Sequence, residues 1–265
     1  MAAILTVYSR SWFFLRWYRF IYALPALYFL IDIIAFTLRT YNLSLLDLFV
    51  TVLTFVFGII LDLLVIITTF QYKNMFDESV STWSLVRRYF WRACGISIAS
   101  IFGVLILISP VCFLIFLVLV AELNGLLVLF LGVALIAFLI FHFGTYGLGL
   151  RILISSNKKI WESMWQGFRE LNIHQASYLP FVIVSVFLSV SPFLFATVLS
   201  GTQFRLNSSL LELAKFVSSV ERSIWSILFL FNYIITPLNI VATTLVYFDN
   251  NFALLPESEN IKVST

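Results

Sequence analysis

Four side chains that can ionise or donate a hydrogen bond interrupt otherwise apolar stretches of this 265-residue sequence: Asp32, Asp62, His142 and Tyr146. A charge at the centre of a lipid bilayer costs about 2.5–3.5 kcal/mol on insertion scales, so residues of this kind are commonly functional. Two carboxyl groups in a low dielectric favour at least one protonated member, and a nearby imidazole can share or exchange that proton. These four residues therefore form a candidate polar layer within a membrane.

A structural role is the alternative for the same residues. Asp32 and Asp62 would then be buried, hydrogen-bonded carboxyl groups, and the ring of His142 would pack between helices. No repeated spacing connects the three residues, so the sequence leaves both interpretations open. The sequence contains none of the common motifs for zinc hydrolysis, nucleophilic serine chemistry, nucleotide phosphate binding or dithiol chemistry. We therefore expect no enzymatic activity, no cofactor and no metal site.

Transmembrane helices are the elements that would position these residues. Hydrophobic residues make up 62% of the sequence and charged residues 11%, which is too apolar for a soluble domain. A helix needs about 20 apolar residues to cross a bilayer. Six windows satisfy this requirement, at residues 20–38, 45–70, 94–120, 125–154, 177–200 and 224–248. We expect an all-α, polytopic integral membrane protein with about six transmembrane helices. A single membrane domain would cover residues 1–250, with a polar cytoplasmic tail at 251–265.

The connections between the six windows are of two kinds. The turns at 41–44 and 122–125 are short and polar. The longer connections, at 71–93, 155–176 and 201–223, are amphipathic. We therefore expect three helical hairpins with cytoplasmic interfacial amphipathic helices between them. Residues 207–222 are expected to form a further amphipathic helix on the outer side.

Positive charge is distributed unevenly between the two sides of this arrangement. Lys and Arg near helix ends are retained on the cytoplasmic side. Twelve lie on one side: Arg10, Arg16, Arg19, Lys73, Arg87, Arg88, Arg92, Arg151, Lys158, Lys159, Arg169 and Lys262. Four lie on the other: Arg39, Arg205, Lys215 and Arg222. We therefore expect a multi-pass protein of a cell membrane, in bacteria the inner membrane, with both termini in the cytoplasm. The net charge of +3 gives no support to nucleic-acid binding.

Tryptophan and arginine occur four residues apart in three places. The pairs are Trp12 with Arg16, Trp83 with Arg87, and Trp165 with Arg169. The second and third pairs are each followed, 27 residues after the Trp, by the proline of a Ser-Pro sequence, at Pro110 and Pro192. This coincidence predicts an internal repeat in which helices at 83–92 and 161–171 lie along the membrane plane. Because Trp suits the headgroup boundary and Arg reaches lipid phosphate, the six residues are candidate contacts to lipid headgroups or a partner protein. Simple anchoring of helix depth is the alternative.

The run Pro237-Leu-Asn-Ile-Val-Ala-Thr-Thr-Leu-Val-Tyr-Phe-Asp249 ends the last predicted helix. It resembles the last helix of a bacterial membrane-domain family named for the membrane domain that precedes some glycerophosphoryl diester phosphodiesterases. The resemblance implies about six helices, amphipathic segments with Trp and Arg between hairpins, and a Thr-Leu-x-Tyr-x-Asp ending. This chain continues with Asn250, Asn251 and Phe252 where such proteins have a basic segment. We expect a stand-alone member, so the resemblance does not imply phosphodiesterase activity.

Two functions are consistent with these features. The first is a non-enzymatic membrane protein that organises lipid or partner membrane proteins at the cytoplasmic face of the membrane. The second is a small carrier or channel-like transporter that uses the layer of Asp32, Asp62 and His142. A polar cavity that reaches this layer would favour the transporter. A tightly packed bundle with exposed amphipathic helices would favour the organising function.

Overall fold

The structure, a computed structural model, is all-helical and has no strand in the residues that it describes. These residues are 2–18, 21, 44–76, 79–120, 133–134, 136–184, 187 and 222–252. Several predictions fall outside them. They concern most of the helix at 20–38 with Asp32, most of the helix at 177–200 with Pro192, the segment 207–221, and the tail from residue 253.

Three helices in the described part are long and apolar enough to cross a membrane: Val52–Tyr72, Thr82–Ile106 and Ile136–Ser156. They overlap the predicted helices at 45–70, 94–120 and 125–154. Between 33% and 50% of each candidate span is buried within the bundle, so much of its apolar surface faces outward. Acyl chains would accept that surface, whereas water would not. The chain is a helical membrane protein, and the arrangement of six helices in three hairpins stays a prediction.

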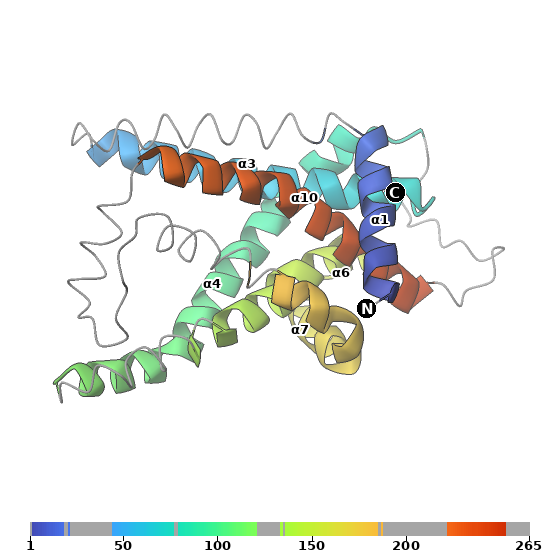
Figure 1. The fold of residues 1–265 in the computed structure, drawn as a ribbon. Helices are drawn as coiled ribbons and strands as arrows, with labels where there is room; N and C mark the ends of the chain where they lie inside the picture. Colours follow the sequence, from blue (N-terminus) through green and yellow to red (C-terminus); the bar gives the residue numbers. More distant parts are fainter. Residues whose placement is uncertain are drawn as a thin grey trace.

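The helices of the described part form one bundle (Figure 1). Their bounds are α1 (Ala2–Trp17), α3 (Ser44–Tyr72), α4 (Thr82–Val120), α6 (Gly149–Ser156), α7 (Ile160–Ile173) and α10 (Arg222–Phe252), with a π-helical segment, η2 (Phe143–Leu148). α3 and α10 lie side by side, and α4 packs against α3. α1 packs against α10 near the C-terminal end of that helix. α7 packs on η2 and α6, and the main core centres on the buried run Leu63–Phe70 of α3.

Residues 83–92 belong to α4, contrary to the expected separate interfacial helix. Thr82–Val120 forms one continuous helix of 39 residues. The physical reason is that residues 83–94 contain neither glycine nor proline, so nothing interrupts the helical hydrogen bonds there. At 1.5 Å per residue, a helix of 39 residues extends about 58 Å, roughly twice the thickness of a bilayer core. One end of α4 must therefore extend beyond the apolar layer, and the end with the arginines is the one that water stabilises.

A separate helix does form at the second predicted segment, 161–171, where α7 lies. It follows Asn157, whose left-handed φ of 51° ends α6, and it stops at His174, before the helix Gln175–Val184. Trp83 therefore begins an unbroken helix, whereas a break separates Trp165 from the helix that follows. The two copies do not share one local structure, so the described residues give no support to the internal repeat.

α7 approaches its neighbours closely because glycines line the contact. A Cβ atom at Gly167 would lie 2.5 Å from the amide nitrogen and 2.9 Å from the Cα of Gly149. A Cβ atom at Gly149 would in turn lie 3.3 Å from the Cα of Met164. At Gly144 the backbone of Phe168 lies 3.3 Å from the Cβ position. The absence of side chains at these glycines therefore fixes where α7 packs on the span Ile136–Ser156.

Candidate functional site

A cavity of about 290 Å³ lies between α3, the span Ile136–Ser156 and α10. Its walls carry a carboxyl group, an imidazole, a phenol and a guanidinium, from Asp62, His142, Tyr146 and Arg151. The wall formed by α10 adds the polar side chains of Thr236, Asn239 and Thr243. Asp62, His142 and Tyr146, which the sequence grouped in one polar layer, thus line the same cavity. Asp32, the fourth residue of that group, lies outside the described residues.

Asp62 lies in an apolar part of α3, between the buried residues Leu61 and Leu63. Its Oδ2 accepts a hydrogen bond of 2.6 Å from the hydroxyl of Tyr146. This bond partly compensates for the removal of the carboxyl group from water. Within the described residues Asp62 makes no other hydrogen bond and no ion pair, so Oδ1 can accept a hydrogen bond from a ligand in the cavity.

His142 is held by two aromatic rings. Its imidazole stacks between Phe138 and Tyr146, with ring centroids 5.7 Å and 5.1 Å away. Its Nδ1 lies 3.2 Å from the hydroxyl of Ser100 on α4, and that hydroxyl also lies 2.7 Å from the hydroxyl of Thr145. Tyr146 therefore connects the two ionisable groups, because its ring stacks on His142 while its hydroxyl binds Asp62.

The π-helical segment η2 helps to bring these side chains together. A π-helix closes its hydrogen bonds from residue i to i+5, so residues five apart come nearer to one face than they do in an α-helix with 3.6 residues per turn. Tyr146 and Arg151 are five residues apart and line the same cavity. Single π-turns of this type often occur at functional sites in helices. Tyr146 lies within this turn and Arg151 follows it in α6, and both side chains line the cavity with Asp62.

Arg151 connects the span Ile136–Ser156 to α10. Its Nε donates to the Thr244 hydroxyl over 3.1 Å, its Nη2 donates to the Ile240 carbonyl over 3.0 Å, and its Nη1 donates to the Gly147 carbonyl. The side chain is buried, with 4% of its surface exposed. No carboxylate lies within ion-pair distance of it in the described part of the chain. Because a guanidinium has five N–H donors, two stay available to a ligand in the cavity.

α1 contacts the cavity wall from outside. The hydroxyl of Tyr8 donates to Oδ1 of Asn239 over 2.8 Å. Burial raises the pKa of Tyr8 to about 12, so the phenol keeps its proton over the whole physiological pH range. In the same helix, Arg10 lies 3.9 Å from Asp249 of α10. The N-terminal helix is thus attached to α10 at two points, one of which is a cavity residue.

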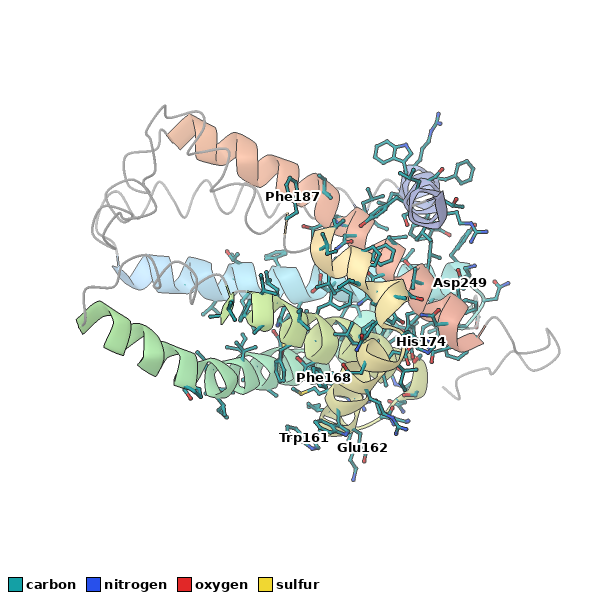
Figure 2. The ribbon with its side chains drawn as sticks, turned by 60° about the horizontal axis from the view of Figure 1, so that its bottom comes forward. Trp161, Glu162, Phe168, His174, Phe187 and Asp249 are labelled. Carbon is teal, nitrogen blue, oxygen red and sulfur yellow. The ribbon has the colours of Figure 1, made fainter. Side chains whose placement is uncertain are left out.

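The six residues that were predicted as lipid or partner contacts lie on the outside of the bundle. Trp12, Trp83 and Trp165 are 58%, 59% and 66% exposed. Arg16, Arg87 and Arg169 are exposed as well. Figure 2 shows the neighbouring Trp161 and Glu162 pointing away from the other helices at the outer side of α7. None of the six lines the cavity with Asp62.

Arg151 and Asn239 are site residues that the sequence reasoning missed. Arg151 was counted among the cytoplasmic charges, but it is buried and lines the cavity. A signal was present, because Arg151 falls inside the apolar window 125–154 and is the only Lys or Arg there. Asn239 was noted only as part of the run 237–249. Like Asp62, Asn239 is a polar residue within an apolar helix, which is the signal that marks it in the sequence.

A scan against protein-family models finds no match to this chain, and searches of curated proteins and of solved structures find none either. The family resemblance at residues 237–249 therefore stays a prediction.

The arrangement in the cavity can bind charge and exchange protons. Arg151 presents N–H donors to an anionic group, and Asp62 presents an oxygen to a cationic one. The imidazole of His142 lines the same cavity and can hold or release a proton. Within the described residues no three His, Cys, Asp or Glu side chains are grouped so that they could hold a metal ion. Ligand binding with proton exchange is the chemistry that these residues support.

Proposed function

We propose that this chain is a small carrier-like membrane protein that binds a polar solute in the cavity between α3, the span Ile136–Ser156 and α10. The observation that carries the proposal is the position of Asp62, His142 and Arg151 around one cavity of about 290 Å³ in an otherwise apolar bundle. Burying such groups without full hydrogen bonding costs free energy. A solute that completes their hydrogen bonds would offset this cost.

The chemistry of the cavity favours a solute with both an anionic and a cationic group. The free N–H donors of Arg151 suit a carboxylate, and Oδ1 of Asp62 suits an ammonium group. Asp62 and His142 can also take up protons, so movement of the solute would be coupled to the pH difference across the membrane.

Asp62→Asn tests the carrier. The amide is close in size to the carboxyl group and its oxygen still accepts the bond from Tyr146, so the fold is expected to persist. The amide carries no negative charge and takes up no proton. Vesicles containing the wild-type protein should accumulate labelled amino acids, used as probes for small zwitterions, when a pH gradient is imposed. The Asn variant should reduce this uptake to the level of empty vesicles.

Two further variants make the test specific. Tyr146→Phe keeps the stack on His142 but removes the bond to Asp62, so an intermediate rate is expected. Asp249→Asn changes an exposed carboxyl group outside the cavity and should transport like wild type. Equal uptake by wild type and Asp62→Asn, or no uptake by either, would argue against the carrier.

The lipid-organising function is a second candidate, and the exposed tryptophans support it. Trp12 on α1, Trp83 on α4 and Trp165 on α7 each lie one helical turn from an exposed arginine. Tryptophan with arginine suits the headgroup region of a membrane. A carrier also needs such contacts to fix its depth, so the two functions are compatible.

We propose further that the side of the protein with these arginines faces the cytoplasm, as the charge asymmetry of the sequence predicts. In a background without Cys94 and Cys112, a single Lys158→Cys probe should resist an impermeant maleimide added outside intact cells. It should react once the cells are permeabilised. Arg205→Cys should show the opposite behaviour. Strong external labelling at position 158 would reverse the orientation.

A further inference from the structure

A second and larger pocket, of about 610 Å³, lies where the loop after α6, the helix α7 and the end of α10 meet. Its walls carry charges of both signs, from Lys158, Arg169 and Glu170. Neutral polar groups come from Gln166, Tyr247 and Asn251. This pocket shares none of the residues Asp62, His142 and Arg151 with the carrier cavity and is a separate site.

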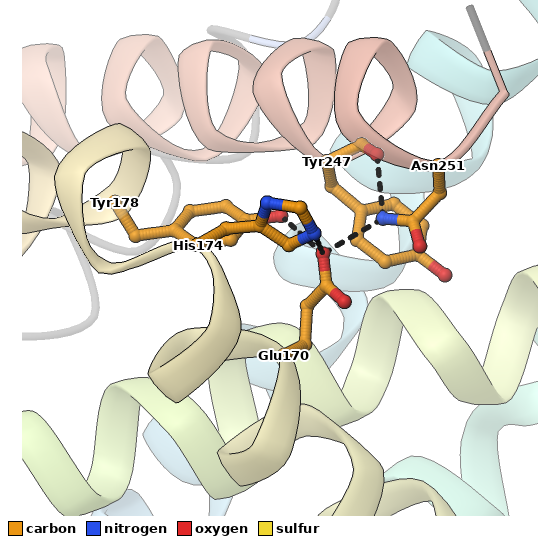
Figure 3. A network of polar contacts seen from close by, with 5 residues as sticks. All are labelled: Glu170, His174, Tyr178, Tyr247 and Asn251. Atoms are coloured by element: carbon orange, nitrogen blue, oxygen red, sulfur yellow. Dashed lines mark hydrogen bonds and ion pairs between the residues drawn. The ribbon is translucent and has the colours of Figure 1, made fainter. Parts of the chain in front are cut away.

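The carboxylate of Glu170 is fixed in one orientation (Figure 3). Its Oε1 accepts hydrogen bonds from the Tyr178 hydroxyl over 3.2 Å and from Nδ2 of Asn251 over 2.8 Å. Nε2 of His174 lies 3.8 Å from the same oxygen. All three partners contact Oε1, so Oε2 has no partner within the described residues. A carboxylate held by one oxygen, with the other free in a pocket, is suited to accept a hydrogen bond from a cationic ligand.

The two cations of the pocket also keep free donors. Lys158 Nζ donates to Oε1 of Gln166 over 2.8 Å, which occupies one of its three N–H groups. Arg169 is exposed and makes no hydrogen bond or ion pair with any described residue. The loop that carries Lys158 is held in place from α4, because Arg92 donates to the side chain of Asn157 and to the carbonyl of Lys158. The pocket thus carries two cationic side chains with free N–H donors and one carboxylate with a free oxygen.

The remaining walls and surroundings favour a lipid as the source of the ligand. Met75, Ile173 and Phe252 line the pocket with apolar surface. On the outer side of α7, Trp161 and Trp165 are 72% and 66% exposed. Tryptophans with this exposure are favoured at the headgroup level of a bilayer. The charged groups of the pocket are therefore expected to lie at the depth of lipid phosphates.

We propose that this pocket binds the headgroup of a zwitterionic phospholipid that ends in a primary amine. Lys158 and Arg169 contact the phosphate diester, and Oε2 of Glu170 accepts a hydrogen bond from the ammonium group. The apolar wall contacts the glycerol and the first acyl carbons. A quaternary ammonium lacks N–H donors and loses the bond to Glu170, and a glycerol headgroup lacks the positive charge.

Lipid competition tests the proposal on the full chain. The protein in mild detergent is mixed with equal amounts of phosphatidylethanolamine, phosphatidylcholine and phosphatidylglycerol of one chain length, and the retained lipids are counted by native mass spectrometry. We expect phosphatidylethanolamine to be retained with at least about tenfold preference, because a hydrogen bond to a charged group discriminates on that scale. Equal retention of the three lipids by the wild type would overturn the proposal.

Matched variants assign the preference to the pocket. Glu170→Gln should remove the preference for phosphatidylethanolamine over phosphatidylcholine. Arg169→Gln changes an exposed side chain, so it should fold normally and weaken retention of all three lipids about tenfold. Arg87→Gln, an exposed arginine of α4 outside the pocket, should behave like the wild type. If Arg169→Gln and Arg87→Gln give the same lipid pattern, the pocket is not the binding site.

A water-soluble competitor distinguishes a lipid from a free phosphodiester with the same headgroup. Glycerophosphoethanolamine carries the phosphate and the amine but no acyl chains. We expect it to leave bound phosphatidylethanolamine in place at equal concentration, because it gains nothing from the apolar wall. Displacement of the lipid at equal concentration would overturn the lipid assignment. The outcome of all these measurements is independent of solute uptake, so this proposal and the carrier can fail separately.

Discussion

Gly167→Ala is expected to destabilise the protein by about 3 kcal/mol, the upper end of the range for overpacked cores. The added Cβ atom would lie 2.5 Å from the amide nitrogen and 2.9 Å from the Cα of Gly149, and both are backbone atoms. Side chains can rotate away from a clash, but two packed helices can relieve this one only by separating. The apparent melting temperature in detergent should fall by roughly 6–12 °C, from the usual 2–4 °C per kcal/mol for a protein of this size.

The matched control is Gly58→Ala in the candidate span Val52–Tyr72. Nothing lies within 4 Å of the Cβ position at Gly58, so the added methyl group meets no atom. The only expected effect is the higher helix propensity of alanine. The substitution is expected to leave the melting temperature unchanged or raise it slightly, by up to about 1 kcal/mol of stability. The comparison removes the general effect of Gly→Ala in a helix. Equal melting temperatures for the two variants would show that α7 does not pack on Gly149 in the protein.

The helical class and three of the spans could be predicted from the sequence because apolar length is a local property. The windows 45–70, 94–120 and 125–154 each overlap one of the candidate spans, although none has the same ends. The continuity of the helix through residues 83–94 could not be predicted from polarity, which suggested an interfacial helix followed by a separate transmembrane helix. A change from charged to apolar residues does not by itself end a helix, because the helical hydrogen bonds are made by the backbone. α4 therefore continues through a change in polarity that appeared to separate two elements.

The candidate site was predicted in part, for a related reason. Asp62 and His142 could be singled out because the sequence alone shows a polar residue within an apolar stretch. Their shared cavity depends on how three helices rotate against one another, and on a π-turn that shifts the register before Arg151. Neither the rotation of the helices nor the position of the π-turn can be read from the residue types along the sequence. The glycines at 144, 149 and 167 come from segments that only tertiary packing brings together.

Arg151→Met is expected to abolish solute uptake while it leaves the fold largely intact. The two carbonyls that Arg151 contacts, of Gly147 and Ile240, are helical carbonyls, and the Thr244 hydroxyl also donates to Ile240. All three acceptors therefore keep other partners when the guanidinium is removed. Replacement of a buried charge by an apolar side chain of similar length is often neutral or stabilising. The melting temperature should change by no more than a few degrees, far less than for Gly167→Ala.

The proposed ligand, unlike these three acceptors, loses its main hydrogen-bond donor when Arg151 is replaced. Without the guanidinium, the described residues that line the cavity include no Lys or Arg side chain to pair with the anionic group. A lost charge-assisted pair costs about 3 kcal/mol, so uptake in reconstituted vesicles should fall by more than about 100-fold. Arg151→Lys keeps the charge but not the planar fork, and an intermediate rate is expected. Normal uptake by a folded Arg151→Met protein would exclude the guanidinium from ligand binding. Unfolding as severe as that of Gly167→Ala would show instead that Arg151 serves mainly to hold α10 against the span Ile136–Ser156.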